Sequence, residues 1–367
     1  MKINLAIVGI EGLPNKYGGF ETLASYLAKY LSNEFNITVY CSSTDLGASD
    51  QHFEDIHLKY IGYSSHGWQG VLYDVLSLND ALKYNDVVFF LGFGAGPYFP
   101  LLSKKNKSKI VLNFGGLDWQ RSKWNKITRK VIQSFEAMMV KNVEWVVADN
   151  KRIAEYIQST YHKKPIEISY GGDQVKRLEI TEELLKEYPF LNQPYACGVC
   201  RIQADNNVEM ILHAFSKSSF PLIMIGNWDT SAFGKKCLMK YKGFANLHLV
   251  NAIYDETKLN QIRSNCSIYV HGHSAGGTNP SLIEAMHLGL NIFAYTSGYN
   301  EITTQGLAKY FNSDIELLEL VEHFNDKQPN DLAVKMQRYA EQNYTWEKIS
   351  AKYKDLFLKL YHQNNGA

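Results

Sequence analysis

Residues 270–286 read VHGHSAGGTNPSLIEAM, the layout of a strand end, a loop of small and polar residues, and a helix. The apolar run at 266–270 predicts a short buried strand, and helical spacing resumes at Pro280. Backbone amides in such a loop and at a helix N-terminus approach a diphosphate closely, and the helix dipole favours its charge. The stretch therefore predicts an anion site, with Glu284 one turn into the helix placed to bind a ribose. A strand-to-helix turn with a capping serine and no ligand is the other interpretation.

The same alternation of strand and helix extends through the chain in both directions. In the N-terminal half the pattern predicts strands at 3–8, 37–40, 58–60, 87–91, 110–113 and 145–148, with helices at 23–31, 71–82, 124–141 and 151–161. In the C-terminal half it predicts strands at 195–200, 222–225, 247–250, 266–270 and 291–295, with helices at 206–216, 255–264 and 281–288. Such alternation indicates an α/β fold of two Rossmann-like, doubly wound domains facing a central cleft.

Length and turn signals suggest where the domains divide. A chain of 367 residues exceeds what one hydrophobic core usually supports. We expect an N-terminal domain at 1–175, a C-terminal domain at 176–330 that opens with a charged linker containing Pro189 and Pro194, and a helical segment at 331–367. That segment is long enough to cross back and pack on the first domain, and a cap on the second domain is the alternative.

Composition excludes several classes of protein. An apolar fraction of 45%, a charged fraction of 20% and a net charge of +1 are those of a globular protein without a general affinity for nucleic acid. Cys197 and Cys200 lie in an apolar run without a second ligand pair, so reduced core thiols are expected rather than a zinc site. The N-terminal apolar run is too short for a signal peptide, and no run approaches the roughly 18 residues of a membrane span, so we expect a cytoplasmic protein.

Two motifs carry a resemblance to a known family. YGGFET at 17–22 and GGTNPSLIEAM at 276–286 each fall at a predicted strand-loop-helix junction. In that order they resemble the retaining GT-B glycosyltransferases, in the branch of bacterial capsule, O-antigen and cell-wall rhamnosyltransferases. The resemblance implies an acceptor-binding first domain and a second domain that binds a nucleotide sugar. It also implies transfer of L-rhamnose from dTDP-rhamnose to a lipid-linked saccharide, with UDP- or GDP-linked sugars as alternatives.

The resemblance suggests roles for particular residues. Gly18 and Gly19 would let the first loop approach the substrates, although a tight turn would also need them. Glu21 either binds a ligand or complements the helix dipole. Arg201 follows a predicted strand and matches an arginine that pairs with the donor diphosphate. The lysine that the family places five residues later is Asn206 here, so one expected positive charge is missing.

A pair of glutamates eight positions apart is also incomplete. Glu284 matches the ribose-binding second member, and Gly276 stands in place of the first, which holds the donor sugar in relatives. We expect the sugar contact to come from elsewhere in the same stretch, and the predicted donor-binding set is therefore Gly276, Gly277, Thr278, Asn279, Ser281, Glu284 and His273. His273 could equally serve only to structure the loop.

The stretch 113–124, NFGGLDWQRSKW, resembles a further element of this branch. Asp118 lies beyond a predicted strand and could bind or polarise an acceptor hydroxyl. Cations interleave there with Trp119 and Trp124 in a pattern that suits a lipid-linked acceptor at a membrane surface, namely Arg121, Lys123, Lys126, Arg129 and Lys130. An ordinary solvated helix face is the alternative. We expect the enzyme to associate peripherally with the inner face of the membrane.

The implied reaction is same-face substitution, in which the departing phosphate oxygen accepts the proton of the attacking hydroxyl. Arg201, Asp118 and His273 are the predicted catalytic residues. The scheme requires no metal, and no Asp-x-Asp motif is present to hold one. A nucleotide-sugar epimerase of the same fold and an inactive binding protein remain open. A dinucleotide oxidoreductase is disfavoured because residues 9–12, GIEG, lack the usual Gly-x-Gly-x-x-Gly.

Overall fold

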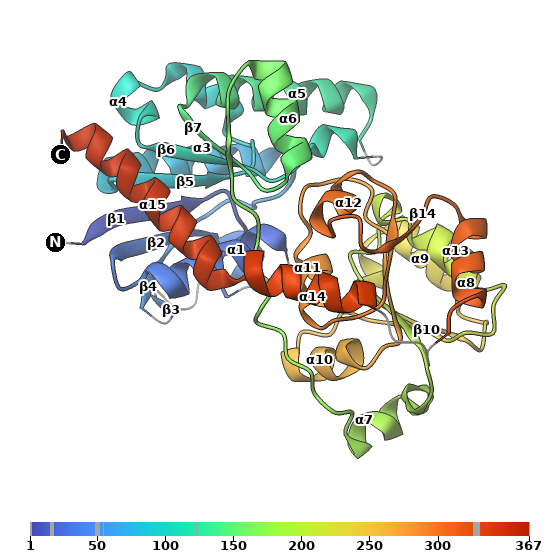
Figure 1. Ribbon diagram of the computed structural model, residues 1–367. Coiled ribbons are helices and arrows are strands. Elements are labelled where there is room, and N and C mark those ends of the chain that lie inside the picture. The colour runs from blue at the N-terminus through green and yellow to red at the C-terminus, as the bar shows by residue number, and fades with distance from the viewer. Residues whose placement is uncertain are drawn as a thin grey trace. The chain divides into compact units, whose positions relative to one another are not determined.

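The computed structural model describes residues 2–14, 18–47, 52–53, 55–121, 124–325 and 331–366. The chain divides into two compact units. The first comprises the chain up to Gln120, Trp124–Tyr170 and the C-terminal segment from Trp346, and the second comprises Gly171–Thr345 together with Arg121. Each unit is built on its own sheet with helices around it (Figure 1).

The sheet of the first unit is doubly wound. Its strand order is β3-β4-β2-β1-β5-β6-β7-β8, and the described pairs are parallel except for β3 with β4. Strand β1 lies between β2 and β5, so the strand order reverses there. The strands are β1 (Ile3–Val8), β2 (Phe35–Ser42), β3 (His52–Phe53), β4 (Ile56–Ile61), β5 (Val87–Leu91), β6 (Ile110–Phe114), β7 (Trp145–Ala148) and β8 (Ile166–Glu167).

Helices and short turns connect the parallel strands, which need crossover connections. They are α1 (Gly19–Leu31), α2 (Ser43–Leu46), α3 (Gly67–Tyr84), α4 (Lys104–Lys107), α5 (Lys126–Asn142) and α6 (Lys151–Tyr161), with short 3-10 turns η1 (Gly96–Leu101) and η2 (Asp118–Gln120). Strands β5 and β6 are buried at every position, which explains their continuous apolar sequence.

The last helix, α15 (Trp346–Asn365), belongs to the first unit. Its aromatic side chains account for this placement: Trp346 stacks on Tyr26 of α1 at 4.4 Å between ring centroids, and Tyr353 meets Phe89 of β5 at 5.1 Å. Figure 1 shows α15 running beside α1. The predicted return of the C-terminal helix to the first domain is confirmed.

The second unit has a parallel sheet of order β11-β10-β9-β12-β13-β14. Strand β9 lies between β10 and β12, which places the reversal of strand order at β9 and β12. The strands are β9 (Ala196–Val199), β10 (Leu222–Ile225), β11 (Leu247–Val250), β12 (Ile268–His271), β13 (Ile292–Tyr295) and β14 (Lys309–Phe311).

The helices of the second unit are α7 (Glu182–Glu187), α8 (Val208–Phe215), α9 (Ala232–Tyr241), α10 (Glu256–Ser264), α11 (Pro280–His287), α12 (Tyr299–Thr303), α13 (Asp314–Glu322) and α14 (Asp331–Asn343), with 3-10 turns η3 (Pro189–Asn192), η4 (Ala204–Asn206) and η5 (Trp228–Thr230). Helix α14 packs on α11, so the C-terminal helical segment is shared between the units.

The prediction of two doubly wound α/β domains is confirmed, and the structure adds elements that the sequence pattern did not indicate. Helix α9 lies between two predicted strands, and β14 and α13 follow the last of them. The charged stretch expected as a linker is part of the second unit, where the Leu178 N–H donates to Ser264 Oγ at 3.2 Å. No helix within the described ranges combines the length and apolar character needed to cross a bilayer.

Candidate functional site

The reversal of strand order in the second unit brings two loops together. Loop 200–207 follows β9 and loop 272–279 follows the adjacent parallel strand β12, so both leave the same edge of the sheet. Ligands of open α/β sheets bind outside the carboxyl ends of the strands at such a reversal. Arg201 and the residues predicted from the sequence to bind the donor are all on these two loops and on α11, the helix that follows.

Side chains bond the two loops to each other. Asn207 Nδ2 donates to the Gly272 carbonyl at 2.9 Å, and Ser274 Oγ donates to the Asp205 carbonyl at 2.7 Å. Buried Asn206 donates from Nδ2 to the Arg201 carbonyl at 2.6 Å, across the base of the first loop. These bonds fix both backbones, and Asn206, at the position where the sequence resemblance implies a lysine, ties the loop together and adds no charge.

Arg201 is exposed near the start of this loop, directly after β9. Its guanidinium is close enough to His273 to lower the pKa of that imidazole, although burial is the largest cause and His271 the second. The structure therefore brings together two of the three residues predicted to be catalytic, Arg201 and His273.

The first turn of α11 has few amides left for a ligand. Asn279 caps the helix, because its Oδ1 accepts from the Ser281 N–H at 3.1 Å and from Ser281 Oγ at 2.8 Å. Pro280 has no N–H, and the N–H groups of Leu282 and Ile283 donate to the Asn279 carbonyl. The N–H groups of the first helical turn, which were expected to bind an anion, are therefore already bonded to Asn279.

The loop before the helix is different. Among the described residues, none accepts from the N–H groups of Ala275, Gly276 or Gly277. Gly276 has φ +119° with no heavy atom within 4 Å of a Cβ built on it, so the backbone angle, and not crowding, calls for glycine. Thr278, next in the chain, is buried. The loop offers backbone amides at the position where the sequence resemblance implies a glutamate, and the positive φ of Gly276 disfavours any side chain there.

Glu284 is held by two neighbours in the second unit. Its Oε2 pairs with the Arg263 guanidinium, and its Oε1 accepts from Gln174 Nε2. The Arg263 side chain is 4% exposed and that of Glu284 is 16% exposed, so the ion pair is nearly dry. A carboxylate has roughly four acceptor positions, which leaves capacity for a ribose hydroxyl beside these partners.

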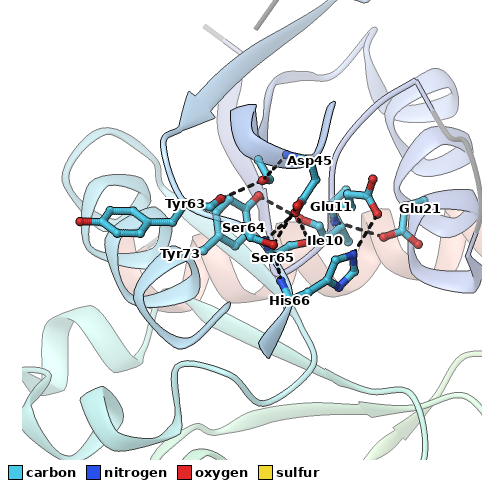
Figure 2. Close-up of polar contacts among 10 residues, drawn as sticks. Ile10, Glu11, Glu21, Asp45, Tyr63, Ser64, Ser65, His66 and Tyr73 are labelled. Atoms are coloured by element: carbon cyan, nitrogen blue, oxygen red, sulfur yellow. Dashed lines mark hydrogen bonds and ion pairs between the residues drawn. The ribbon is translucent and has the colours of Figure 1, made fainter. Parts of the chain in front are cut away.

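The corresponding edge of the first unit carries carboxylates. Glu21, in the first turn of α1, accepts at Oε1 from the Glu11 N–H at 3.1 Å, and Glu11 Oε2 lies 3.4 Å from His66 Nε2 (Figure 2). Gly18 caps this helix at φ +140°, and a Cβ there would lie 2.0 Å from Glu21 Oε2. Glycine at 18 therefore allows Glu21 to fold over the loop. Gly19 begins the helix, and Tyr17 of the motif lies outside the described residues.

A second cluster fixes the neighbouring loop after β4. Asp45 accepts from Ser64 Oγ at 2.7 Å and from the Ser65 N–H at 2.7 Å (Figure 2). Burial alone would raise the pKa of Asp45, but the bonds from Ser65 and Ser64 outweigh it and lower the pKa. This carboxylate organises the segment that presents His66.

The motif phenylalanine, Phe20, lies over the ends of two central strands. A Cβ on Gly115, just after β6, would lie 2.2 Å from its ring, and one on Gly92, just after β5, would lie 3.8 Å from it. Asp118 follows in η2. The pKa of buried Tyr170 is raised well above its usual value, mainly by burial and further by the Asp149, Glu21 and Asp118 carboxylates among its neighbours. Glu21 and Asp118 thus lie at one edge of the first unit.

One titratable group near Asp118 was missed from the sequence. Glu136 of α5 is fully buried and accepts at Oε1 from Tyr156 Oη at 2.8 Å and from Tyr161 Oη at 2.7 Å. Burial raises its pKa to about 7, with the Asp118 charge adding to the rise and the tyrosine bonds opposing it. Tyrosines at 156 and 161 give no sequence signal of this contact, because it joins two helices.

The basic and aromatic patch is placed partly as expected. Lys126 and Lys130 are exposed on α5, whereas Arg129 Nε donates to the Trp124 carbonyl at 3.0 Å and Lys123 lies outside the described residues. Exposed apolar residues, which were not expected from the sequence, lie next to these lysines. Ile127 is 77% exposed and Val131 is 43% exposed, and Leu101 of η1, which packs on α5, is 78% exposed.

Comparison with known proteins yields one family model. A domain of unknown function, DUF1972, matches residues 2–173, which cover most of the first unit. No curated protein sequence matches the chain.

Solved structures of the same architecture match nearly the whole chain. Sucrose-phosphate synthase from Thermosynechococcus elongatus has a TM-score of 0.83 at 13% identity, covering 99% of this chain and 100% of its own. HepE of Anabaena in complex with UDP-glucose has a TM-score of 0.72 at 12% identity, covering 97% and 100%. The catalytic domain of starch synthase IV from Arabidopsis thaliana, bound to ADP and acarbose, has a TM-score of 0.71 at 12% identity, covering 98% and 100%. The chain therefore has the GT-B fold of these proteins.

Proposed function

We propose that this protein is a retaining glycosyltransferase that moves a sugar from a nucleotide donor to a lipid-linked saccharide. The observation that carries the proposal is the pair of clamped loops at the strand reversal of the second unit. They carry an exposed arginine, Arg201, and a run of amides at 275–277 for which the described part of the chain supplies no acceptor. This combination suits a diphosphate, and the structures that share the fold include complexes with UDP, UDP-glucose and ADP.

On the donor side, Arg201 and the loop amides would stabilise the leaving diphosphate. Glu284, oriented by Arg263 and Gln174, would bind the ribose, and Thr278, Asn279 and Ser281 would shape the loop around the phosphates. Preorganised donors of this kind lower the barrier because they are already aimed where charge develops.

On the acceptor side, Asp118 would orient the attacking hydroxyl, with Glu21 and the Gly18–Gly19 backbone lining the same edge of the first unit. The acceptor oxygen forms the new bond to the anomeric carbon on the face from which the phosphate leaves. The hydroxyl proton passes to the departing phosphate oxygen, so the scheme needs no enzymatic nucleophile and no metal.

The resemblance of the two motifs supports L-rhamnose as the sugar and dTDP-rhamnose as the donor, in the synthesis of a bacterial surface polysaccharide such as O-antigen or capsule. The UDP and ADP complexes among the structural neighbours favour testing other nucleotides as well. A UDP-linked donor is therefore the second candidate.

We also propose that the exposed face of α5 meets the cytoplasmic side of the membrane that carries the acceptor. Ile127 and Val131, one turn apart, are exposed next to Lys126 and Lys130, and exposed Leu101 adjoins the same helix through η1. Apolar side chains flanked by lysines suit insertion between anionic headgroups.

A panel of nucleotides and nucleotide sugars tests the proposal. We expect dTDP-rhamnose to raise the thermal unfolding midpoint more than the UDP-, GDP- and ADP-linked sugars do, and radiolabelled sugar to pass to a lipid-linked acceptor. Stabilisation by a UDP-linked sugar with transfer would support the second candidate. Binding of a nucleotide sugar without transfer to any lipid acceptor would contradict the transferase proposal.

A further inference from the structure

Strand β12 ends in a ladder of stacked rings. Tyr269, His271 and His273 alternate along the strand and its first loop residues. The Tyr269 and His271 rings are 6.2 Å apart at an interplanar angle of 24°, and the His271 and His273 rings are 4.4 Å apart at 15°. The ladder leads from the interior of the second unit to the loop that carries Gly276.

The imidazoles of this ladder have unused polar atoms. His271 is 1% exposed, and neither of its ring nitrogens has a hydrogen-bond partner among the described residues. His273 Nδ1 is likewise buried and without a partner in this part of the chain. Buried polar atoms in native proteins are nearly always bonded, so atoms left over at a candidate site point to a ligand or an ordered water.

The backbone around the ladder is, by contrast, firmly bonded. Asn300 Nδ2 donates to the His273 carbonyl at 3.0 Å and to the Tyr295 carbonyl at 2.8 Å, and Asn207 holds the Gly272 carbonyl. The main chain is therefore fixed, whereas both nitrogens of His271 and Nδ1 of His273 have no hydrogen-bond partner within the described ranges.

Both imidazoles are neutral at physiological pH. Burial lowers the pKa of His271 to about 3, and burial with the neighbouring His271 and Arg201 lowers the pKa of His273 well below its usual value. A neutral imidazole has one N–H donor and one lone-pair acceptor. That pair matches a hydroxyl group, which also donates and accepts, better than it matches a phosphate.

We propose that His273 recognises a hydroxyl of the donor sugar, the role that the resemblance gives to a glutamate at position 276. We propose further that His271 is a positioning residue that fixes the ring plane of His273 by stacking. The inference rests on the proposed function, since it assigns the sugar contact within that donor site. This sugar contact is distinct from the diphosphate contacts that the proposed function assigns to Arg201 and the loop amides.

Calorimetric titration separates the sugar contact from the phosphate contact. The probes are dTDP with dTDP-rhamnose, and UDP with UDP-glucose. For the pair that binds, His273→Phe is expected to weaken the nucleotide sugar about tenfold, the effect of losing one good hydrogen bond, and to leave the free diphosphate within about twofold. Equal weakening of both ligands, or of neither, would overturn the assignment of His273.

Three variants at the ladder test the positioning role. His271→Phe keeps a ring in the stack, so it should still bind the nucleotide sugar more tightly than the free diphosphate, as wild type does. His271→Ala removes the ring, and its affinity for the nucleotide sugar should fall nearly as far as in His273→Phe. Tyr269→Phe is the matched control, since it changes one polar atom of the same ladder and should behave as wild type. A His271→Ala protein with full sugar preference would refute positioning.

Imidazole ¹⁵N NMR of the wild-type protein gives an independent measurement if a variant fails to fold. We expect neutral ring signals at pH 5.5 for both histidines, and a shift of the His273 signals with the nucleotide sugar but not with the diphosphate alone. Signals that respond to neither ligand, while the nucleotide binds, would overturn this inference alone. A wild-type protein that binds no nucleotide would overturn the proposed function and the inference with it.

Discussion

The two units carry opposite chemistry at equivalent places in the same fold. Where strand order reverses in the second unit, the loops present Arg201, neutral imidazoles, and amides that have no acceptor among the residues the structure describes. Where it reverses in the first unit, the nearby side chains are the carboxylates of Glu11 and Glu21, with Asp118 after β6. Carboxylates repel a diphosphate and attract hydroxyl groups. The difference therefore indicates that the second unit suits the donor phosphates and the first suits an acceptor hydroxyl.

The two edges are also stabilised differently. The loops of the second unit are tied by amide and hydroxyl side chains that donate to backbone carbonyls, as Asn206 does to Arg201. The loops of the first unit are tied by carboxylates that accept from backbone N–H groups and hydroxyls, as Glu21 does from Glu11 and Asp45 does from Ser65. The loops proposed to meet a diphosphate are thus held by neutral side chains, and those proposed to meet a hydroxyl are held by carboxylates.

The largest effect should come from breaking the buried ion pair in the second unit. Removal of one partner leaves an uncompensated buried charge, so Glu284→Gln and Arg263→Met should each cost about 3–5 kcal/mol of unfolding free energy. The double variant should cost clearly less than their sum. Denaturant unfolding of the four proteins measures the coupling. Additive costs would show that the pair is not coupled, and a stable Glu284→Gln protein would show that Glu284 serves only a ligand.

Through Glu136 the first unit should lose stability as pH rises, which is opposite to the direction expected from the buried neutral histidines of the second unit. Burial raises the pKa of Glu136 to about 7, so the folded state keeps its proton after the unfolded chain has lost it. The contribution of Glu136 to stability is therefore lost as pH rises from about 4.5 through 7, by up to ~3 kcal/mol.

Glu136→Gln keeps an oxygen for the two tyrosines and removes the titration. Compared with wild type, it should gain stability progressively between pH 5 and pH 8, as measured by denaturant midpoints at each pH. Glu209→Gln, at an exposed ion pair in the second unit, is the control. Parallel pH curves for wild type and Glu136→Gln would show that Glu136 does not carry the shift.

The alternation of strands and helices could be predicted because buried parallel strands such as Val87–Leu91 are continuous apolar runs. Helix α9 was missed because its short sequence, AFGKKCLMKY, contains Gly234 and a weak apolar face. In the candidate donor site, the motifs were enough to propose Arg201 and Glu284.

The partners of Glu284, Arg263 and Gln174, could not be predicted, because they reach Glu284 only when separate elements pack together. A buried Glu136 gives no signal in an otherwise amphipathic helix sequence.

A smaller effect is expected from the clamp that holds Arg201. Asn206→Ala removes the bond to the Arg201 carbonyl and should cost about 1–3 kcal/mol of unfolding free energy. At saturating donor, the folded variant should also transfer sugar more slowly than the folded wild type. Asn265→Ala breaks similar bonds to the Leu178 and Gln261 carbonyls in the same unit and should lose stability only. Equal activity per folded molecule in both variants would contradict a specific role for the clamp.

The smallest effect concerns the α5 surface of the first unit. Replacing Lys126 and Lys130 by glutamate should weaken binding to anionic vesicles by about 1 kcal/mol for each lost lysine, and the difference should shrink with added salt. Lys235 and Lys236 of α9, changed in the same way, are the matched control in the second unit. Vesicle sedimentation that does not distinguish the two pairs would return the α5 surface to an ordinary solvated face.

The central claim, that the second unit binds the diphosphate and the first serves the acceptor, is tested most directly by calorimetry with a nucleoside diphosphate. Wild type, Arg201→Ala and Asp118→Asn would be titrated with dTDP and UDP, and their transfer activity measured in parallel. We expect Arg201→Ala to weaken binding at least about tenfold, and Asp118→Asn to bind as wild type does yet transfer poorly. Unchanged binding in Arg201→Ala, or an equal loss in Asp118→Asn, would contradict it.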